Sequence, residues 1–153
     1  MKITFKHRAD YYFWAFALVV IIKGLISYAL GNEGTVINIH DSYYIISPVD
    51  GILLNGGLLI VIGFIYYALY AAGIPLIKKI TKLHTSACMM VYLTAWIALP
   101  VMDHYHSQPV VSLPWFTAPD VMLIFFILLF ILMQLLLLIN AAIGIVKKLR
   151  AGN

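Results

Sequence analysis

Two short polar segments combine histidine with aspartate, the residue types that bind divalent metals. His40 and Asp41 are adjacent in one segment, and the other holds Asp103, His104 and His106. Imidazole suits zinc and copper, whereas carboxylates suit magnesium and manganese, so these five groups would form a metal site if the two segments met. Polar segments between apolar runs also carry His and Asp for solvation alone, so both interpretations stay open.

A lysine and an aspartate next to apolar runs form a second candidate constellation. Asp50 follows Ser47 and Pro48 at the spacing of a helix start, with Ser47 as N-cap and Pro48 at the first helical position. Lys23 lies inside an apolar run, where a lysine at the centre of a bilayer costs about 2.5–3.5 kcal/mol. We therefore predict an intramembrane pair between Lys23 and Asp50.

The elements that must position these residues are four long apolar runs. The chain has 153 residues, of which 63% are hydrophobic and 10% charged, and the runs cover about 11–30, 48–72, 83–102 and 120–146. Each has the roughly 20 residues that a helix needs to cross a bilayer. None alternates with the period of two that a barrel strand requires, so helices remain. We predict one all-α domain with four transmembrane helices.

Charge placement predicts the orientation of these helices. Nine of the ten basic residues fall at the chain ends or in the segment between the second and third runs, and they are Lys2, Lys6, Arg8, Lys78, Lys79, Lys82, Lys147, Lys148 and Arg150. The positive-inside rule then places both termini and the 73–82 loop in the cytoplasm, with the 31–47 and 103–118 loops outside. The basic residues accompany no stacking platform, which argues against a nucleic-acid partner.

Small and amide side chains inside the runs predict helix packing. Asn55, Gly56 and Gly57 occupy the middle of the second run, where small residues allow close approach and an amide can bond to a neighbouring helix. The amides Gln134 and Asn140, together with Thr94, are candidates for the same role. The single cysteine, Cys88, permits no intrachain disulfide.

Two segments resemble the catalytic subunit of haem–copper (cytochrome c) oxidases. "INIHDSYYII", residues 37–46, is similar to that family's His-Asp-Thr-Tyr-Tyr-Val-Val segment, and "LIKKITKLHTSACMMVYLTAW", residues 76–96, is similar to its basic loop and penultimate helix. The resemblance implies that this chain corresponds to the final four helices of that subunit. It also implies that His40 and Asp41 match a pair that helps to hold magnesium or manganese in the oxidases.

The departures from the family exclude its chemistry. Alignment from His40 places Pro48, Val49 and Asp50 where the family has the His-Phe-His that ligates two haem irons. Proline and valine cannot ligate iron, and a carboxylate replaces imidazole poorly in a haem site. The family's copper-binding histidines belong to earlier helices. We therefore expect no haem and no oxygen reduction, and we interpret His84, at the start of the third run, as an interfacial residue.

Three functional hypotheses follow. The first is a non-catalytic protein of a bacterial inner membrane that assembles with itself, with a homotrimer as the form that would rebuild twelve helices, or joins a respiratory or other membrane complex. The second is an outward-facing metal-binding or sensing protein that uses zinc, copper, magnesium or manganese. The third is a haem or quinone electron-transfer protein. The sequence contains no constellation typical of a hydrolase or transferase.

Overall fold

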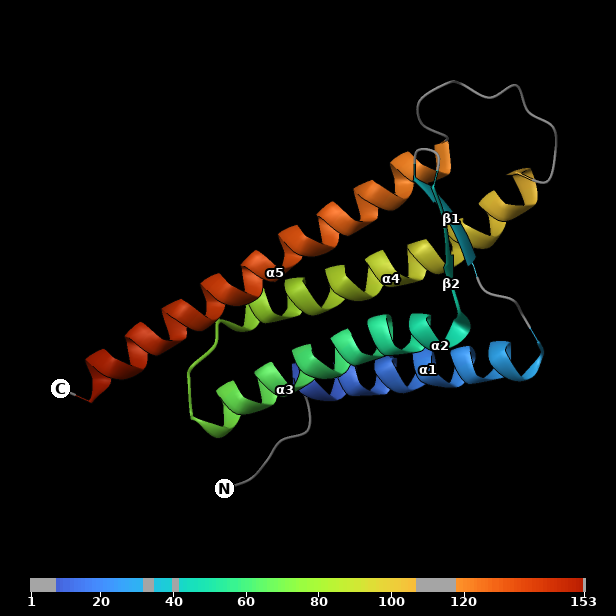
Figure 1. Ribbon diagram of the computed structural model, residues 1–153. Coiled ribbons are helices and arrows are strands. Elements are labelled where there is room, and N and C mark those ends of the chain that lie inside the picture. The colour runs from blue at the N-terminus through green and yellow to red at the C-terminus, as the bar shows by residue number, and fades with distance from the viewer. Residues whose placement is uncertain (1–7, 32–34, 40–41, 107–117, 153) are drawn as a thin grey trace. The chain divides into compact units, whose positions relative to one another are not determined.

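The computed structural model describes residues 8–31, 35–39, 42–106 and 118–152. The chain divides into two compact units, Met1–Pro75 and Leu76–Asn153, which we call the N-terminal and C-terminal units (Figure 1). The N-terminal unit contains α1 (Ala9–Ala29), β1 (Thr35–Ile39), β2 (Ser42–Ile46), α2 (Pro48–Gly51), the π-helix η2 (Ile52–Gly56) and α3 (Gly57–Ala71). The C-terminal unit contains α4 (Lys78–His106) and α5 (Ala118–Ala151).

In the N-terminal unit, α1 packs against the continuous helix formed by α2, η2 and α3 (Figure 1). The buried side chains of this interface are mainly apolar and aromatic. Phe13 of α1 stacks on Tyr66 of α3 with ring centroids 5.7 Å apart. Leu59 and Ile62 of α3 are also buried. Stacked rings and buried aliphatic side chains therefore contribute to this unit's core.

The second helix begins as the sequence predicts. The backbone N–H of Asp50 donates to Ser47 Oγ at 3.1 Å, and the Ser47 N–H donates to Asp50 Oδ2 at 3.2 Å. These reciprocal bonds form a capping box, so the N-cap prediction is confirmed. The helix ends at Ala71, and Gly73 follows the Ala72 C-cap with a φ of +65° that favours glycine. The Ile74 N–H then donates to the Leu69 carbonyl at 3.0 Å.

A π-turn interrupts this helix, and sequence analysis missed it. Residues Ile52–Gly56 have π-helical bonding, and the Asn55 Nδ2 group donates to the Gly51 carbonyl at 3.0 Å. A π-turn disturbs the regular ladder of backbone bonds, and a polar side chain can satisfy a carbonyl there. No hydropathy pattern indicates such a turn, because the run stays apolar throughout.

The segment before this helix contains an antiparallel hairpin where a loop was predicted. Strand β1 pairs with β2 in a register that matches Thr35 with Ile46 and Ile39 with Ser42. The predicted helical architecture is confirmed, and the difference is local: the segment predicted as a 31–47 loop contains this short hairpin. Both strands are rich in β-branched and aromatic residues, which favour extended backbone.

In the C-terminal unit, α4 and α5 pack against each other along buried residues of both helices. Tyr92 of α4 meets Phe130 of α5 edge to face at 5.5 Å, and Leu137 is buried. Helix α4 extends beyond the predicted 83–102 span at both ends. The predicted 103–118 loop is therefore too long, because residues 103–106 continue α4 and α5 starts at Ala118.

Three helical segments in the described part of the chain are long and apolar enough to cross a membrane. They are Ala9–Ala29, Val49–Ala71 and Phe125–Ala151. The helices and their apolar character support a multi-pass membrane protein in contact with lipid. The fourth span over 83–102 and the orientation of the termini stay predictions.

Candidate functional site

The predicted metal ligands lie largely outside what the structure describes. His40 and Asp41 are outside the described residues. Asp103, His104 and His106 belong to the last turn of α4, and their side chains are outside the described part as well. Among the side chains that the structure does describe, no group of three or more His, Cys, Asp or Glu is placed to hold a metal ion. The metal site stays a prediction.

The predicted Lys23–Asp50 pair is also untested. Both side chains are exposed, and the Asp50 carboxylate accepts a bond from Ser47 Oγ at 2.8 Å in addition to the Ser47 N–H. The described contacts of Asp50 thus belong to the helix start, in agreement with the structural interpretation of this residue. A link to Lys23 remains a hypothesis for mutagenesis.

The three residues predicted to pack helices lie in different surroundings. Gly56 is buried, and a Cβ atom there would lie 3.0 Å from Ile21 Cγ1 of α1. A Cβ atom at Gly57 would meet nothing within 4 Å, and Asn55 bonds within its own helix. The tightest approaches are at Gly24 and Gly63. An added Cβ would lie within 2.7 Å of two Ile52 atoms at Gly24, and within 3.2 Å of three indole atoms of Trp14 at Gly63.

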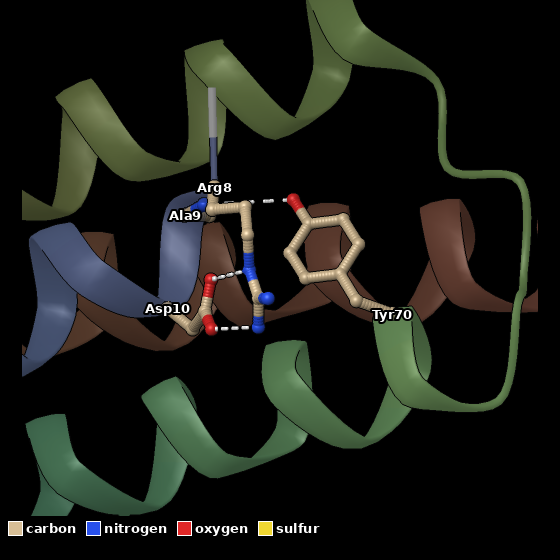
Figure 2. Close-up of polar contacts among 4 residues, drawn as sticks. All are labelled: Arg8, Ala9, Asp10 and Tyr70. Carbon is tan, nitrogen blue, oxygen red and sulfur yellow. Dashed lines mark hydrogen bonds and ion pairs between the residues drawn. The ribbon is translucent and has the colours of Figure 1, made fainter. Parts of the chain in front are cut away.

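A partly buried ion pair lies at the start of α1 in the N-terminal unit. Figure 2 shows the Arg8 guanidinium beside the carboxylate of Asp10, with Arg8 Nε donating to Asp10 Oδ1 at 3.1 Å and Nη2 donating to Oδ2. Asp10 is fully buried, whereas the Arg8 side chain is 21% exposed. The hydrogen bond to Asp10 is the main cause that raises the pKa of Arg8 above its ordinary value.

Tyrosine side chains surround this arginine. The guanidinium carbon lies 4.8 Å from the ring centroid of Tyr11, 5.4 Å from Tyr70 and 5.7 Å from Tyr67. The Ala9 N–H donates to the Tyr70 hydroxyl at 3.5 Å (Figure 2). Cation–π contacts and a planar two-point bond suit arginine, so this cluster ties the start of α1 to the end of α3.

Sequence analysis missed the Arg8–Asp10 cluster. It assigned Arg8 only to the basic side of the membrane and gave Asp10 no role. The available signal was an arginine and an aspartate two positions apart at the start of an apolar run. The contacts of the cluster link the start of α1 to the end of α3.

A set of buried polar side chains lies between α4 and α5. His84 and Cys88 of α4 are fully buried, and Cys88 Sγ is 3.4 Å from His84 Nε2. From α5, the Gln134 Nε2 group donates to Cys88 Sγ at 3.7 Å and to the Phe130 carbonyl at 3.2 Å. The side chain of His84 is enclosed by protein. Its place at the membrane interface stays a prediction.

Asn140 supplies the other bonds across this interface. Its Oδ1 atom accepts from the Ile77 N–H at 2.8 Å, and its Nδ2 group donates to Thr81 Oγ1 at 2.9 Å. Ile77 immediately precedes α4, so Asn140 satisfies one of the N–H groups that a helix start leaves unpaired. The prediction that Gln134 and Asn140 bond across helices is confirmed. Thr94 instead donates to the Met90 carbonyl of its own helix at 2.8 Å.

An open apolar groove of about 210 Å³ lies between α4 and α5. Its lining includes Met90 and Thr94 of α4 and Phe126 and Met133 of α5. The groove offers no ionisable group of its own, which gives it no means of acid–base chemistry.

Comparison of the chain with protein-family models, curated proteins and solved structures found no match. The oxidase resemblance therefore rests on the two sequence segments that carry it.

Proposed function

We propose that this chain is a non-catalytic integral membrane protein with four spans that acts by assembly, either with copies of itself or with other subunits of a membrane complex. The observation that carries this proposal is the apolar surface that the helices leave uncovered. In the three apolar helical segments, only 17%, 28% and 11% of the residues of the most apolar window are buried within the chain. Lipid or another protein must cover the rest, because water would not.

The length of helix α4 supports a fourth crossing of the membrane. Helix α4 is 29 residues long, which is more than enough to span the hydrocarbon core. With four crossings, the basic residues of the two chain ends and of residues 78–82 fall on the same side. By the positive-inside rule that side is the cytoplasm, and a bacterial inner membrane fits this arrangement.

The oxidase resemblance supports a specific form of assembly. A homotrimer of four-helix chains would bring twelve helices together around one axis, because a cyclic oligomer uses one heterologous interface repeatedly. An accessory role in a respiratory complex is the other form. Both forms agree with helices that pack closely.

The experiment is a native mass measurement of the full chain purified in mild detergent, with crosslinking in intact membranes. Assembly predicts a discrete oligomer, with a trimer as the expected mass, or a stable complex with other membrane subunits. A monodisperse monomer that forms no crosslinks in membranes would overturn the proposal. A fusion reporter placed in residues 103–118 tests the orientation, with periplasmic activity expected.

The same purified protein tests the alternative functions. Stoichiometric zinc, copper, magnesium or manganese that disappears in a His104→Ala/His106→Ala variant would favour the metal-binding hypothesis. A Soret band in the visible spectrum would favour the haem hypothesis. Proper assembly without either signal is the result expected for the proposed function.

A further inference from the structure

The basic residues of the C-terminal unit gather at one end of the α4–α5 pair. The two helices run antiparallel, since Asn140 near the end of α5 bonds to Ile77 and Thr81 at the start of α4 (Figure 1). The start of α4 and the end of α5 therefore share one end of this unit. The exposed basic side chains at this end are Lys78, Lys79, Lys82, Lys147, Lys148 and Arg150. Both acidic residues of the unit, Asp103 and Asp120, belong to the opposite ends of the two helices.

The proposed function places this basic end among the lipid headgroups of the cytoplasmic leaflet. That placement requires α4 to cross the membrane beside α5, and the binding site described next rests on this crossing. Exposed lysines and arginines at a membrane surface attract anionic lipids, whereas a zwitterionic lipid carries no net charge for them to attract. Like charges also repel one another, so an anionic headgroup among them offsets that repulsion.

The open groove between α4 and α5 has the lining that an acyl chain needs. Its lining includes Ala87 and Met90 of α4 and Phe126 and Met133 of α5, and it contains no charged side chain. Methionine side chains adapt their shape to irregular apolar partners. A charged ligand would lose its hydration in such a groove without gaining a partner, so the groove suits a hydrocarbon chain.

The lysines of α4 lie closer to this groove than the basic residues of α5 do. On α4, Lys82 precedes the groove residue Ala87 by five positions, which is about 7.5 Å along the helix axis. On α5, Lys147 follows the groove residue Met133 by 14 positions, which is about 21 Å. A lipid that uses the groove therefore meets the lysines of α4 first.

One face of α4 connects its lysines to the groove. Lys79 and Met90 are 11 positions apart, which is about three full turns, so they lie on the same face of the helix. Leu83 lies between them on this face, and it is exposed, as is Met90. The axial distance from Lys79 to Met90 is about 16 Å, close to the roughly 15 Å of hydrocarbon in one leaflet. A lipid with its headgroup at Lys79 thus has a chain long enough to reach the groove.

We propose that the C-terminal unit binds one anionic phospholipid, with the phosphate held by Lys78, Lys79 and Lys82 and an acyl chain in the groove between α4 and α5. The three lysines are three or four positions apart or adjacent, so they form one basic face of α4. The acyl chain covers part of the apolar surface that this unit leaves exposed, including Leu83 and Met90.

Native mass spectrometry of the full chain in mild detergent tests the headgroup site, with phosphatidylglycerol and phosphatidylcholine of identical acyl chains as probes. We expect one phosphatidylglycerol per chain and little phosphatidylcholine at the same concentration. Lys78→Gln/Lys79→Gln/Lys82→Gln should weaken the binding of phosphatidylglycerol by about 10-fold or more. The matched control, Lys147→Gln/Lys148→Gln/Arg150→Gln, removes the same charge farther from the groove and should weaken binding clearly less.

Ala87→Phe tests the groove, because its aromatic ring takes the space of the acyl chain. This variant should lose most of its bound phosphatidylglycerol. Ala142→Phe is the matched control, since Ala142 is exposed on α5 and lies outside the groove lining, and it should bind the lipid like the wild type. Glycerol phosphate has the charge of the headgroup but no acyl chain, so it should not displace the lipid.

Several results would overturn the site. One is equal retention of the two lipids, and another is an equal loss in the two variants that remove three basic residues. Displacement by glycerol phosphate would show that charge alone accounts for binding. If Ala87→Phe changes the oligomer mass while the lipid stays bound, a second copy of the chain occupies the groove instead.

The same spectra separate the lipid site from the proposed assembly. An oligomer that retains no phosphatidylglycerol contradicts the lipid site alone, whereas a monomer that carries one phosphatidylglycerol supports the site and contradicts assembly. If the variants do not fold, photocrosslinking of the wild type decides, with phosphatidylglycerol that carries a photoreactive acyl chain. Labels on Met90 or Met133 are expected, and labels confined to the N-terminal unit contradict the site.

Discussion

The two helix pairs of this protein are held together by different contacts. Between α1 and the α2–η2–α3 helix, glycines at positions 24, 56 and 63 allow close approach. Aromatic rings also meet across this interface, and Arg8, paired with Asp10 at the start of α1, lies over tyrosine rings of α3. Between α4 and α5, side chains such as His84, Gln134 and Asn140 bring hydrogen-bonding groups into the interface. Helices in lipid gain little from the hydrophobic effect, so packing and hydrogen bonds must drive association.

The two interfaces should therefore lose stability through different kinds of substitution. A close-packed interface is sensitive to added volume, because rigid neighbours cannot move aside. A hydrogen-bonded interface is sensitive to the loss of a partner, because the group left behind stays unsatisfied. Four sets of variants test this contrast.

The largest loss is expected from Asp10→Ala in the N-terminal unit. This change leaves the Arg8 guanidinium without its carboxylate, and Arg8 is only partly exposed. We expect the free energy of unfolding in mixed detergent micelles to fall by about 2–3 kcal/mol. Arg8→Lys keeps the charge but loses the two-point bond, so an intermediate loss is expected. Equal stability of Asp10→Ala and wild type would mean that the pair contributes nothing.

Gly63→Ala is expected to cost somewhat less, about 2 kcal/mol, because the added methyl group overlaps the Trp14 indole. Gly57→Ala is the matched control on the same helix. Its methyl group meets nothing within 4 Å, and alanine is the better helix former by about 1 kcal/mol. The same unfolding titration compares the two variants. If Gly57→Ala is as unstable as Gly63→Ala, the loss at Gly63 does not come from overlap with the Trp14 indole.

Asn140→Ala tests the hydrogen-bonded interface of the C-terminal unit. It removes the partner of the Ile77 N–H and of Thr81 Oγ1, and we expect a loss of about 1–1.5 kcal/mol. Ile139→Ala is the control, since Ile139 is exposed beside it and bonds to nothing across the interface through its side chain. If the Ile77 amide exchanges its hydrogen faster in Asn140→Ala but not in Ile139→Ala, the loss of stability comes from the bond between Ile77 and Asn140.

The smallest effect is expected at the exposed helix start. Ser47→Ala should cost about 0.5–1 kcal/mol, the typical value of an N-cap. Asp50→Ala in wild-type and Lys23→Met backgrounds then tests the predicted pair. An intramembrane pair predicts a coupling energy of at least about 0.5 kcal/mol in the double-mutant cycle. Strict additivity would assign Asp50 to the helix cap alone.

Local signals in the sequence were sufficient for much of the fold. The apolar runs predicted where each long helix lies, and Ser47-Pro48-Val49-Asp50 predicted the start of one helix to the residue. The hairpin was missed because its strands are only five residues each, too short for a clear alternating pattern. The π-turn at Ile52–Gly56 was missed because a change in backbone bonding leaves no trace in hydropathy.

The candidate sites were predictable only in part. Amides at 134 and 140 in an apolar run predicted bonds across helices, because an amide in lipid requires a partner. Neither the Arg8–Asp10–Tyr70 cluster nor the encounter of His84, Cys88 and Gln134 was predicted. Arg8 and Tyr70 are 62 positions apart, and Cys88 and Gln134 are 46 apart. No local pattern connects residues at such separations.

By itself, the sequence determined that this chain forms long apolar helices suited to a membrane, because backbone groups in lipid must bond within a helix and hydropathy shows where that occurs. The tertiary structure decided which glycines admit a neighbouring helix, which carboxylate is enclosed, and which amide of α5 meets Cys88 of α4. Those outcomes depend on how two helices are rotated and shifted against each other, and that geometry is set by the sum of many weak packing contacts.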